Sequence, residues 1–181
     1  MNSEITQLYK KILIELNLEN ILDDIDESAA KAASLLAEWT VAAKQPPPQI
    51  RPLPAPENPD WITIENIHYY SLCQHDFVPF FGTASIAYLP DKKIAGFGTF
   101  PKTLHHLTKI PQFQETLTQK IADTLQNALQ PRALLIRLTA RHLCLEMRIN
   151  SPQTTCTTLA ARGLCQNPEI RNLAISLLTS T

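Results

Sequence analysis

Two short segments of the sequence combine side chains that bind metals with side chains that transfer protons. One segment contains Cys73, His75 and Asp76, and the other contains His142 and Cys144. Zinc takes three or four thiolate, imidazole or carboxylate ligands, and a catalytic site keeps one position open for water. Cys73, Asp76 and Cys144 could supply such a set, with His75 and His142 as proton carriers near neutral pH. Taken separately, a cysteine in an apolar strand is more typical of a small buried side chain than of a ligand.

The segments around these residues have the composition of β-strands. WITIENIHYYSL and FVPFFGTASIAYLP are rich in β-branched and aromatic residues, which favours strands. Residues 133–140 and 142–149 have the same texture, and we expect them to form a hairpin or one strand that continues through a bulge. The tract 154–163 is predicted to be a further extended piece. Cys73 would then lie at the end of a strand, and His142 at the start of one.

One long amphipathic helix is predicted between these strands, over residues 111–130. Five apolar residues recur there at intervals of four: Phe113, Leu117, Ile121, Leu125 and Leu129. Such a stripe buries one face of a helix, and Pro111 suits its first turn. A short closing helix is expected over residues 168–178. Two strands, one or two helices and two more strands predict an α+β fold with an antiparallel sheet.

An N-terminal arm precedes this domain. Its first apolar residues recur at intervals of three and four: Ile5, Leu8, Ile12 and Leu16. This spacing predicts an amphipathic helix, and the Ala-rich residues 28–44 favour a second one. The proline-rich stretch that follows excludes a helix and favours an extended connector. We therefore expect a helical arm over residues 1–45, a connector over 46–60 and one folded domain over 61–181.

The composition excludes several classes of protein. The chain has 16 Lys and Arg against 17 Asp and Glu, so it offers no basic surface for a nucleic-acid backbone. With 44% apolar residues it can bury a core. No apolar stretch approaches the ~20 residues of a membrane span, and the first residues lack the layout of a signal peptide. We expect a cytoplasmic protein with no nucleic-acid or membrane partner, whose cysteines are free thiols or metal ligands.

Four motifs occur in the order and spacing of a known enzyme family. They are LCQHDFVPFFGTASIAYLP, FQETLTQKIADTLQ, ARHLCLEMR and TTCTTLAARG. The GTP cyclohydrolase I family, which the chain resembles from Trp61 to Gly163, shows Cys-Glu-His-His, a Gln-Glu pair, His-x-Cys and a following Arg at these places. The resemblance implies the tunnelling fold, in which an antiparallel sheet carries two antiparallel helices on one face. It also implies a homo-oligomer, most simply a decamer, with sites between subunits.

The resemblance assigns roles to individual residues. It implies that Cys73 and Cys144 bind the metal and that His75 and His142 are catalytic. Gln114 and Glu115 would bind the substrate, with the Glu115 carboxylate accepting hydrogen bonds from the guanine edge. It also implies that Arg148 and Lys102 bind the phosphate groups of the substrate. The metal would be zinc or another divalent cation.

The chain departs from the family pattern at the metal and phosphate positions. Asp76 stands where the family has its third zinc ligand, a His, and Gln74 stands where it has a Glu. Carboxylate oxygen also binds zinc, but a harder ligand changes affinity and metal preference. Gly98-Thr99 stands in place of a Ser-Lys pair, and Lys102 in place of an Arg. The chain therefore resembles a diverged member with altered zinc and triphosphate positions.

The resemblance implies an enzyme that opens the guanine imidazole ring of GTP. The products would be 7,8-dihydroneopterin triphosphate and formate, which would place the chain in tetrahydrofolate biosynthesis and one-carbon metabolism. The altered residues leave two alternatives open. One is a relative that acts on, or binds, a less phosphorylated purine or pterin. The other is a binding or regulatory protein that keeps the pocket without chemistry.

Overall fold

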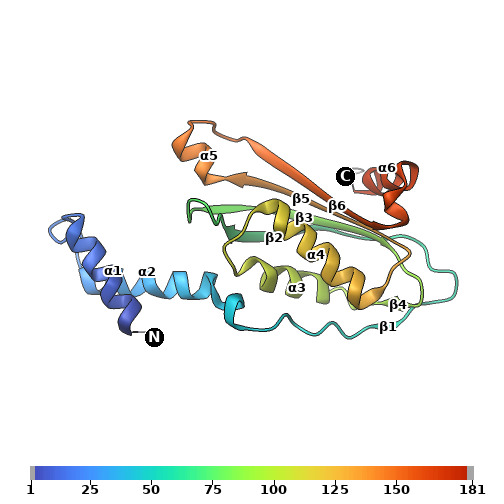
Figure 1. Ribbon diagram of the computed structural model, residues 1–181, viewed down its shortest axis with the longest axis horizontal. Coiled ribbons are helices and arrows are strands. Elements are labelled where there is room, and N and C mark those ends of the chain that lie inside the picture. The colour runs from blue at the N-terminus through green and yellow to red at the C-terminus, as the bar shows by residue number, and fades with distance from the viewer. Residues whose placement is uncertain (1–2, 179–181) are drawn as a thin grey trace.

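The fold is seen in a computed structural model that describes residues 3–178. Its main elements, in chain order, are as follows: α1 (Ser3–Glu15), α2 (Ile25–Trp39), β1 (Leu53–Pro54), β2 (Ile62–Leu72), β3 (Pro79–Leu89), β4 (Lys93–Ile94), α3 (Thr99–Thr108), α4 (Gln114–Leu129), β5 (Ala133–His142), α5 (Leu143–Arg148), β6 (Thr155–Gly163) and α6 (Pro168–Leu177). Short 3-10 helices follow α2 and β6. Figure 1 shows one long sheet with helices packed against it and a helical arm at one end.

The sheet contains four antiparallel strands in the order β2-β3-β5-β6. Strand β3 pairs with β2 on one side and with β5 on the other. The ladder between β3 and β5 runs without interruption from Phe80 opposite His142 to Leu89 opposite Ala133. Successive side chains of such strands point to opposite faces. The register between β3 and β5 therefore determines which side chains lie next to each other on each face of the sheet.

One face of the sheet is covered by α3 and α4, which run in opposite directions across it (Figure 1). The core between helices and sheet includes Phe80, Ile86 and Tyr88 of β3 together with Leu117 and Ile121 of α4. The apolar residues of α4 that recur at intervals of four lie in this core as the sequence predicts. The exception is Phe113, which precedes the helix and is exposed. The buried stripe fixes the rotation of α4 about its axis and therefore the direction in which its first turn points.

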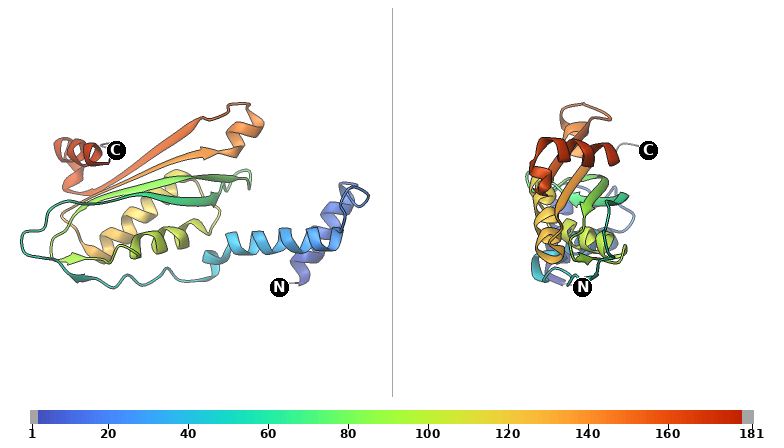
Figure 2. Two further views of the ribbon diagram at one scale, coloured as in Figure 1. Left: turned by 180° about the vertical axis from the view of Figure 1, so that it is seen from behind. Right: turned by 90° about the vertical axis from the view of Figure 1, so that its right-hand side faces the viewer.

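A second, smaller core lies on the other face of the sheet, at one end. There α6 packs on Ala87, Ala133 and Leu135, and contributes Ala174. The view from behind shows α6 at one end of the sheet and α5 at the opposite end (Figure 2). The end that carries α5 is therefore free of the α6 packing.

The N-terminal helices α1 and α2 pack on each other and extend away from the sheet (Figures 1 and 2). The Asp24 side chain caps α2 by accepting a hydrogen bond from the Glu27 amide at 2.9 Å, as expected for a helix start. The connector then runs along the body and pairs β1 with β4. The division of the chain at residues 45 and 60 stays a prediction from the sequence.

The predicted fold class is confirmed: the chain is an α+β protein with the tunnelling-type arrangement of an antiparallel sheet and two antiparallel helices on one face. One predicted element is wrong. Residues 142–149 were expected to form a strand, but the strand ends at His142 and α5 follows. Strand β6 begins at Thr155, opposite Arg141, so the residues after His142 have no partner strand on that side. Leu, Glu, Met and Arg in this segment then favour a helix.

No helix among residues 3–178 combines the length and the apolar composition that crossing a membrane requires.

Gly82 is expected to be essential for the close pairing of β3 with β5. A Cβ atom at Gly82 would lie 1.9 Å from the Thr139 carbonyl oxygen, whereas one at Gly96 would meet nothing within 4 Å. Gly82→Ala should therefore lower the free energy of unfolding by about 1–3 kcal/mol or more, because the backbone must shift. Urea denaturation measures this loss, and Gly96→Ala is the matched control. Equal stability of the two variants would contradict the predicted steric conflict.

Candidate metal centre and catalytic pocket

Strand β2 ends in a tight turn that carries the first group of candidate residues. The Cys73 amide donates to the Val78 carbonyl at 2.9 Å, and the Phe77 amide donates to the Cys73 carbonyl at 2.9 Å. Phe77 has a left-handed backbone conformation with φ of 54°, which is rare for a bulky side chain. The chain therefore reverses here and brings the Asp76 carboxylate back toward the Cys73 thiol.

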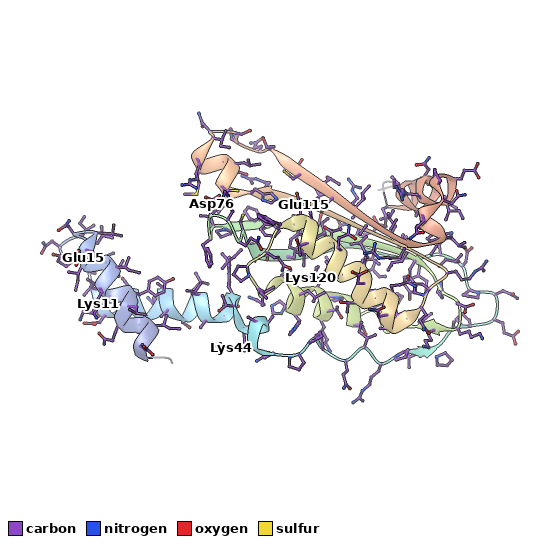
Figure 3. The ribbon with its side chains drawn as sticks, viewed as in Figure 1. Lys11, Glu15, Lys44, Asp76, Glu115 and Lys120 are labelled. Carbon is purple, nitrogen blue, oxygen red and sulfur yellow. The ribbon has the colours of Figure 1, made fainter. Side chains whose placement is uncertain are left out.

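The same turn is tied to the segment that leads into α4. Cys73 forms an isolated bridge with Gln112, and the Gln112 amide donates to the Leu72 carbonyl at 3.0 Å. The buried Gln112 side chain also donates to the Ile110 carbonyl at 3.2 Å. These bonds hold the start of α4, and with it Glu115, at the same end of the sheet as Asp76 (Figure 3).

The second group of candidate residues lies where β5 passes into α5. Arg141 donates from Nε and Nη2 to the two carboxylate oxygens of Glu146 at 2.7 and 2.6 Å. This pairing raises the pKa of Arg141 and lowers the pKa of Glu146. A bidentate pair constrains direction as well as distance. The pair joins the end of β5 to α5, the helix that carries Cys144.

The two groups meet at Cys73, Asp76 and Cys144. Their two Sγ atoms and a carboxylate oxygen all lie within 4.8 Å of one another. In a tetrahedral zinc site with metal–sulfur and metal–oxygen distances of about 2.3 and 2.1 Å, ligand atoms are separated by roughly 3.5–4 Å. The donor set therefore fits a zinc-like cation after small side-chain adjustments. Among the residues that the structure describes, it is the one such group of three.

Asp76 contacts Arg148 and lies near His75, in addition to the two cysteines. Arg148 of α5 donates from Nη1 to Asp76 Oδ1, and His75 Nδ1 lies 3.8 Å from Asp76 Oδ2. The Asp76 side chain is 16% exposed, whereas those of His75 and Arg148 are 81% and 67% exposed. The carboxylate is thus the inner member of this cluster, and the imidazole and guanidinium face solvent.

His142 is held in a defined orientation by Gln114. The Gln114 amide nitrogen donates to the Leu138 and Cys156 carbonyls, both at 3.1 Å, and to the Thr158 hydroxyl at 3.0 Å. Its Oε1 therefore has to be the atom that lies 2.7 Å from His142 Nε2. A carbonyl oxygen only accepts, so this assignment places a proton on Nε2 of His142. Its Nδ1 is left as the basic nitrogen of the neutral ring.

The environment of His142 favours that neutral ring. The imidazole stacks on Phe80, with ring centres 4.9 Å apart and planes 3° from parallel. Burial lowers the pKa of His142, and the negative charge of Glu115 offsets part of that effect. Burial likewise raises the pKa of the Cys144 thiol, and the nearby Cys73 adds to this.

Two adjoining cavities surround the cluster and share Cys144. One cavity, of about 210 Å³, is lined by Cys73, Phe80, Glu115 and His142 among others. The other, of about 480 Å³, is lined by His75, Asp76, Met147 and Arg148 among others. The first is narrow and mostly apolar, which suits a planar ring, and the second carries the exposed cations. The candidate metal ligands lie at the boundary between them.

Of the nine site residues predicted from the sequence, the structure brings eight to these two cavities or their walls. Gln114 is the one whose surroundings differ most from the expected role, because its side chain is 2% exposed and bonded to the sheet and to His142. Lys102 lies elsewhere, in a separate cavity of about 210 Å³ with Arg51 and Thr103. Within a single chain, Lys102 and Arg148 do not line the same cavity.

Sequence reasoning missed the residues that orient His142. Phe80 supplies the ring on which it stacks, and Thr158 of β6 is one of the acceptors that fix the Gln114 amide. Phe80 precedes His142 by more than 60 positions, and only the strand register pairs them. The sequence signal for Phe80 was the aromatic texture of its strand, which does not distinguish a core ring from a site ring.

Comparisons with known proteins show the family of the chain. A family model for GTP cyclohydrolase I matches residues 5–179. GTP cyclohydrolase 1 of Streptococcus pyogenes serotype M18 is 35% identical over 167 residues, which cover 90% of this chain and 84% of that protein. GTP cyclohydrolase 1 of Helicobacter hepaticus is 46% identical over 105 residues, covering 58% of this chain and 51% of that protein. The chain belongs to the GTP cyclohydrolase I family.

A solved structure, the archaeosine synthase QueF-Like in the apo form, was also matched. It covers 59% of this chain and 97% of its own chain, with 13% identity and a TM-score of 0.47.

Cys144 is expected to be required for metal binding. Cys144→Ala removes one of the two thiols of the cluster, so zinc that binds stoichiometrically to the purified protein should be lost. Cys156→Ala is the matched control, because Cys156 also lines the narrow cavity but lies outside the cluster. Metal analysis after dialysis measures both variants. Undiminished zinc in Cys144→Ala would reject this thiol as a ligand.

Gln114 is expected to contribute to stability as well as to orient His142. Gln114→Ala leaves buried acceptors of β5 and β6 without their donor, which costs about 1–3 kcal/mol for an unsatisfied group. Gln126→Ala, on the same helix, is the control because the buried Oε1 of Gln126 has no hydrogen-bond partner among the described residues. Urea unfolding should show the larger loss for Gln114→Ala. A larger loss for Gln126→Ala would contradict this account.

Proposed function

We propose that this chain is a GTP cyclohydrolase I-type hydrolase that opens the imidazole ring of GTP and releases C8 as formate, giving 7,8-dihydroneopterin triphosphate. The observation that carries the proposal is the meeting of the Cys73, Asp76 and Cys144 donor atoms beside a narrow cavity lined by His142 and Glu115. Family membership supports the same reaction. The cavity suits a flat ring, and its lining includes a carboxylate, Glu115, and an imidazole, His142.

A divalent metal fits the donor set, and zinc is the first candidate. Cys73, Asp76 and Cys144 would hold it, since two thiolates and a carboxylate are among the ligands that zinc accepts. When bound, such a cation lowers the pKa of a water molecule to about 7, so that hydroxide is available at neutral pH. The carboxylate in place of the family's imidazole makes manganese and iron(II) worth testing as well.

Glu115 and His142 are the two side chains proposed to act on the purine ring. Glu115, in the first turn of α4, accepts hydrogen bonds from the adjacent ring N–H and amino group of guanine, which needs an anion. His142 has its Nε2 bonded to Gln114, so its Nδ1 takes up or delivers the proton during ring opening. His75, exposed beside Asp76, exchanges protons with solvent.

The phosphate contacts are proposed to come from two chains. Arg148 uses one N–H on Asp76 and has further donors that face the larger cavity, whereas Lys102 lies in a separate cavity. Strands β2 and β6 are the edges of the four-stranded sheet, and open edges favour pairing with further copies. We propose that edge pairing forms a ring, and a decamer of two rings, in which Lys102 of one subunit reaches the site of another. A cytoplasmic location and a role in folate synthesis stay predictions from the sequence.

A second candidate function is favoured by one observation. Lys102 lies with Arg51 in a separate cavity, and Arg148, the arginine that lines the larger cavity, already donates to Asp76. Within one chain the larger cavity therefore offers one arginine to phosphate, which better matches a ligand with fewer phosphates, because each phosphate contact is charge-assisted. Competition binding separates the two candidates: GTP should bind far more tightly than guanosine or neopterin if the triphosphate is recognised.

Turnover of GTP is the test of the proposed function. The purified protein, supplied in turn with zinc, manganese and iron(II), should release formate and give the fluorescence of an oxidised pterin. Glu115→Gln should lower kcat/KM about 10–150-fold, because a hydrogen bond to a charged group contributes about 1.5–3 kcal/mol. Glu169→Gln, in the first turn of α6, is the matched control. A folded protein that turns over GTP with no metal supplied or bound, or a Glu115→Gln variant with full activity, would reject these assignments.

A further inference from the structure

Asp76 takes part in two different interactions. Its carboxylate belongs to the three-donor cluster with Cys73 and Cys144, and it also accepts a hydrogen bond from Arg148 Nη1. The two interactions involve different neighbours on α5, which carries both Cys144 and Arg148. The position of α5 therefore decides both of them together.

The charge of the cluster explains why a cation belongs beside Asp76. With both cysteines deprotonated, the three ligands carry three negative charges, one more than a divalent metal neutralises. A Cys-Cys-His set, which the family pattern has, is neutral with the same metal. Burying an uncompensated charge is costly, and Asp76 is only 16% exposed. A guanidinium in contact with Asp76 supplies the missing positive charge.

Arg148 is the group best placed to supply that charge. Two other basic side chains lie near the site, and neither is as well placed. Arg141 is paired with Glu146, and His75 is 81% exposed and lies 3.8 Å from Asp76. Arg148 contacts one carboxylate oxygen, Oδ1. A carboxylate has a second oxygen with free lone pairs, so Asp76 can bind Arg148 and a metal at the same time.

We propose that Arg148 is a positioning residue for the metal centre: it holds the Asp76 carboxylate and compensates its charge, so that a Cys-Asp-Cys set binds a divalent cation as a Cys-Cys-His set does. The inference rests on the proposed function for the presence of the metal and goes beyond a phosphate contact for Arg148. Partners that orient a metal-ligating side chain are worth about 10–100-fold in metal affinity. Arg148 and Asp76 then form one functional unit.

The experiment is a cobalt(II) titration of the purified full chain without nucleotide or phosphate. Thiolate-to-cobalt absorption reports the ligand set directly and does not depend on turnover. Arg148→Ala should weaken cobalt binding about 10–100-fold, and Arg148→Lys, which keeps the charge, should restore part of the loss. The decisive comparison is the same change in an Asp76→His background. There the cluster needs no extra positive charge, so Arg148→Ala should alter affinity by less than about twofold.

Arg141→Ala is the matched control, because it also breaks an ion pair at α5 but leaves Asp76 untouched. An equal loss of cobalt affinity in Arg141→Ala would overturn the proposal, since both arginines would merely hold α5. So would unchanged affinity in Arg148→Ala, which leaves Arg148 a phosphate ligand only, or an equal loss in the Asp76→His background. Absence of cobalt binding by the unmodified chain would overturn it as well. Turnover of GTP is measured separately, so a failed Arg148 cycle with intact turnover leaves the proposed function standing.

Discussion

Strand β3 lies between β2 and β5 and pairs antiparallel with both. Strands β2 and β5 consequently run in the same direction, and their C-terminal ends lie at the same end of the sheet. Cys73 follows β2 directly, and Cys144 follows β5 after one residue, so antiparallel pairing on both sides of β3 brings the two thiols together. Gly82 permits the close pairing of β3 with β5. The metal cluster depends on this arrangement more than on any contact within itself.

Gln114 connects this end of the sheet to the layer of helices α3 and α4. It lies in the first turn of α4, and its amide reaches carbonyls of β5 and β6 as well as the His142 ring. One buried side chain thus sets the tautomer of His142, the proposed catalytic histidine, and joins three elements. Glu115, the next residue, lines the same narrow cavity but has an exposed side chain. Adjacent helical residues face different directions, which separates a structural role from a ligand role at this pair.

The replacement of a neutral imidazole by the Asp76 carboxylate changes the electrostatics of the whole cluster. A carboxylate beside two thiols needs a cation, and Arg148 approaches it from α5. The guanidinium and a metal can share one carboxylate because it offers two oxygens. A departure from the family pattern at one candidate ligand is therefore accompanied by an ion pair with Arg148 in the same site.

The sequence alone determined the α+β class, the main strands, the amphipathic α4 and the residue types of the site, because periodicity and composition are local properties. The resemblance added the family and the roles of Cys73 and Cys144. Local composition predicted a strand at residues 142–149, but α5 forms there. The reason is tertiary, because β6 begins only at Thr155, opposite Arg141, and does not pair with these residues. The stacking of His142 on Phe80 and the pairing of Arg148 with Asp76 likewise depended on strand register and on α5. Only the tertiary structure decided them, because each joins residues more than 60 positions apart in the chain.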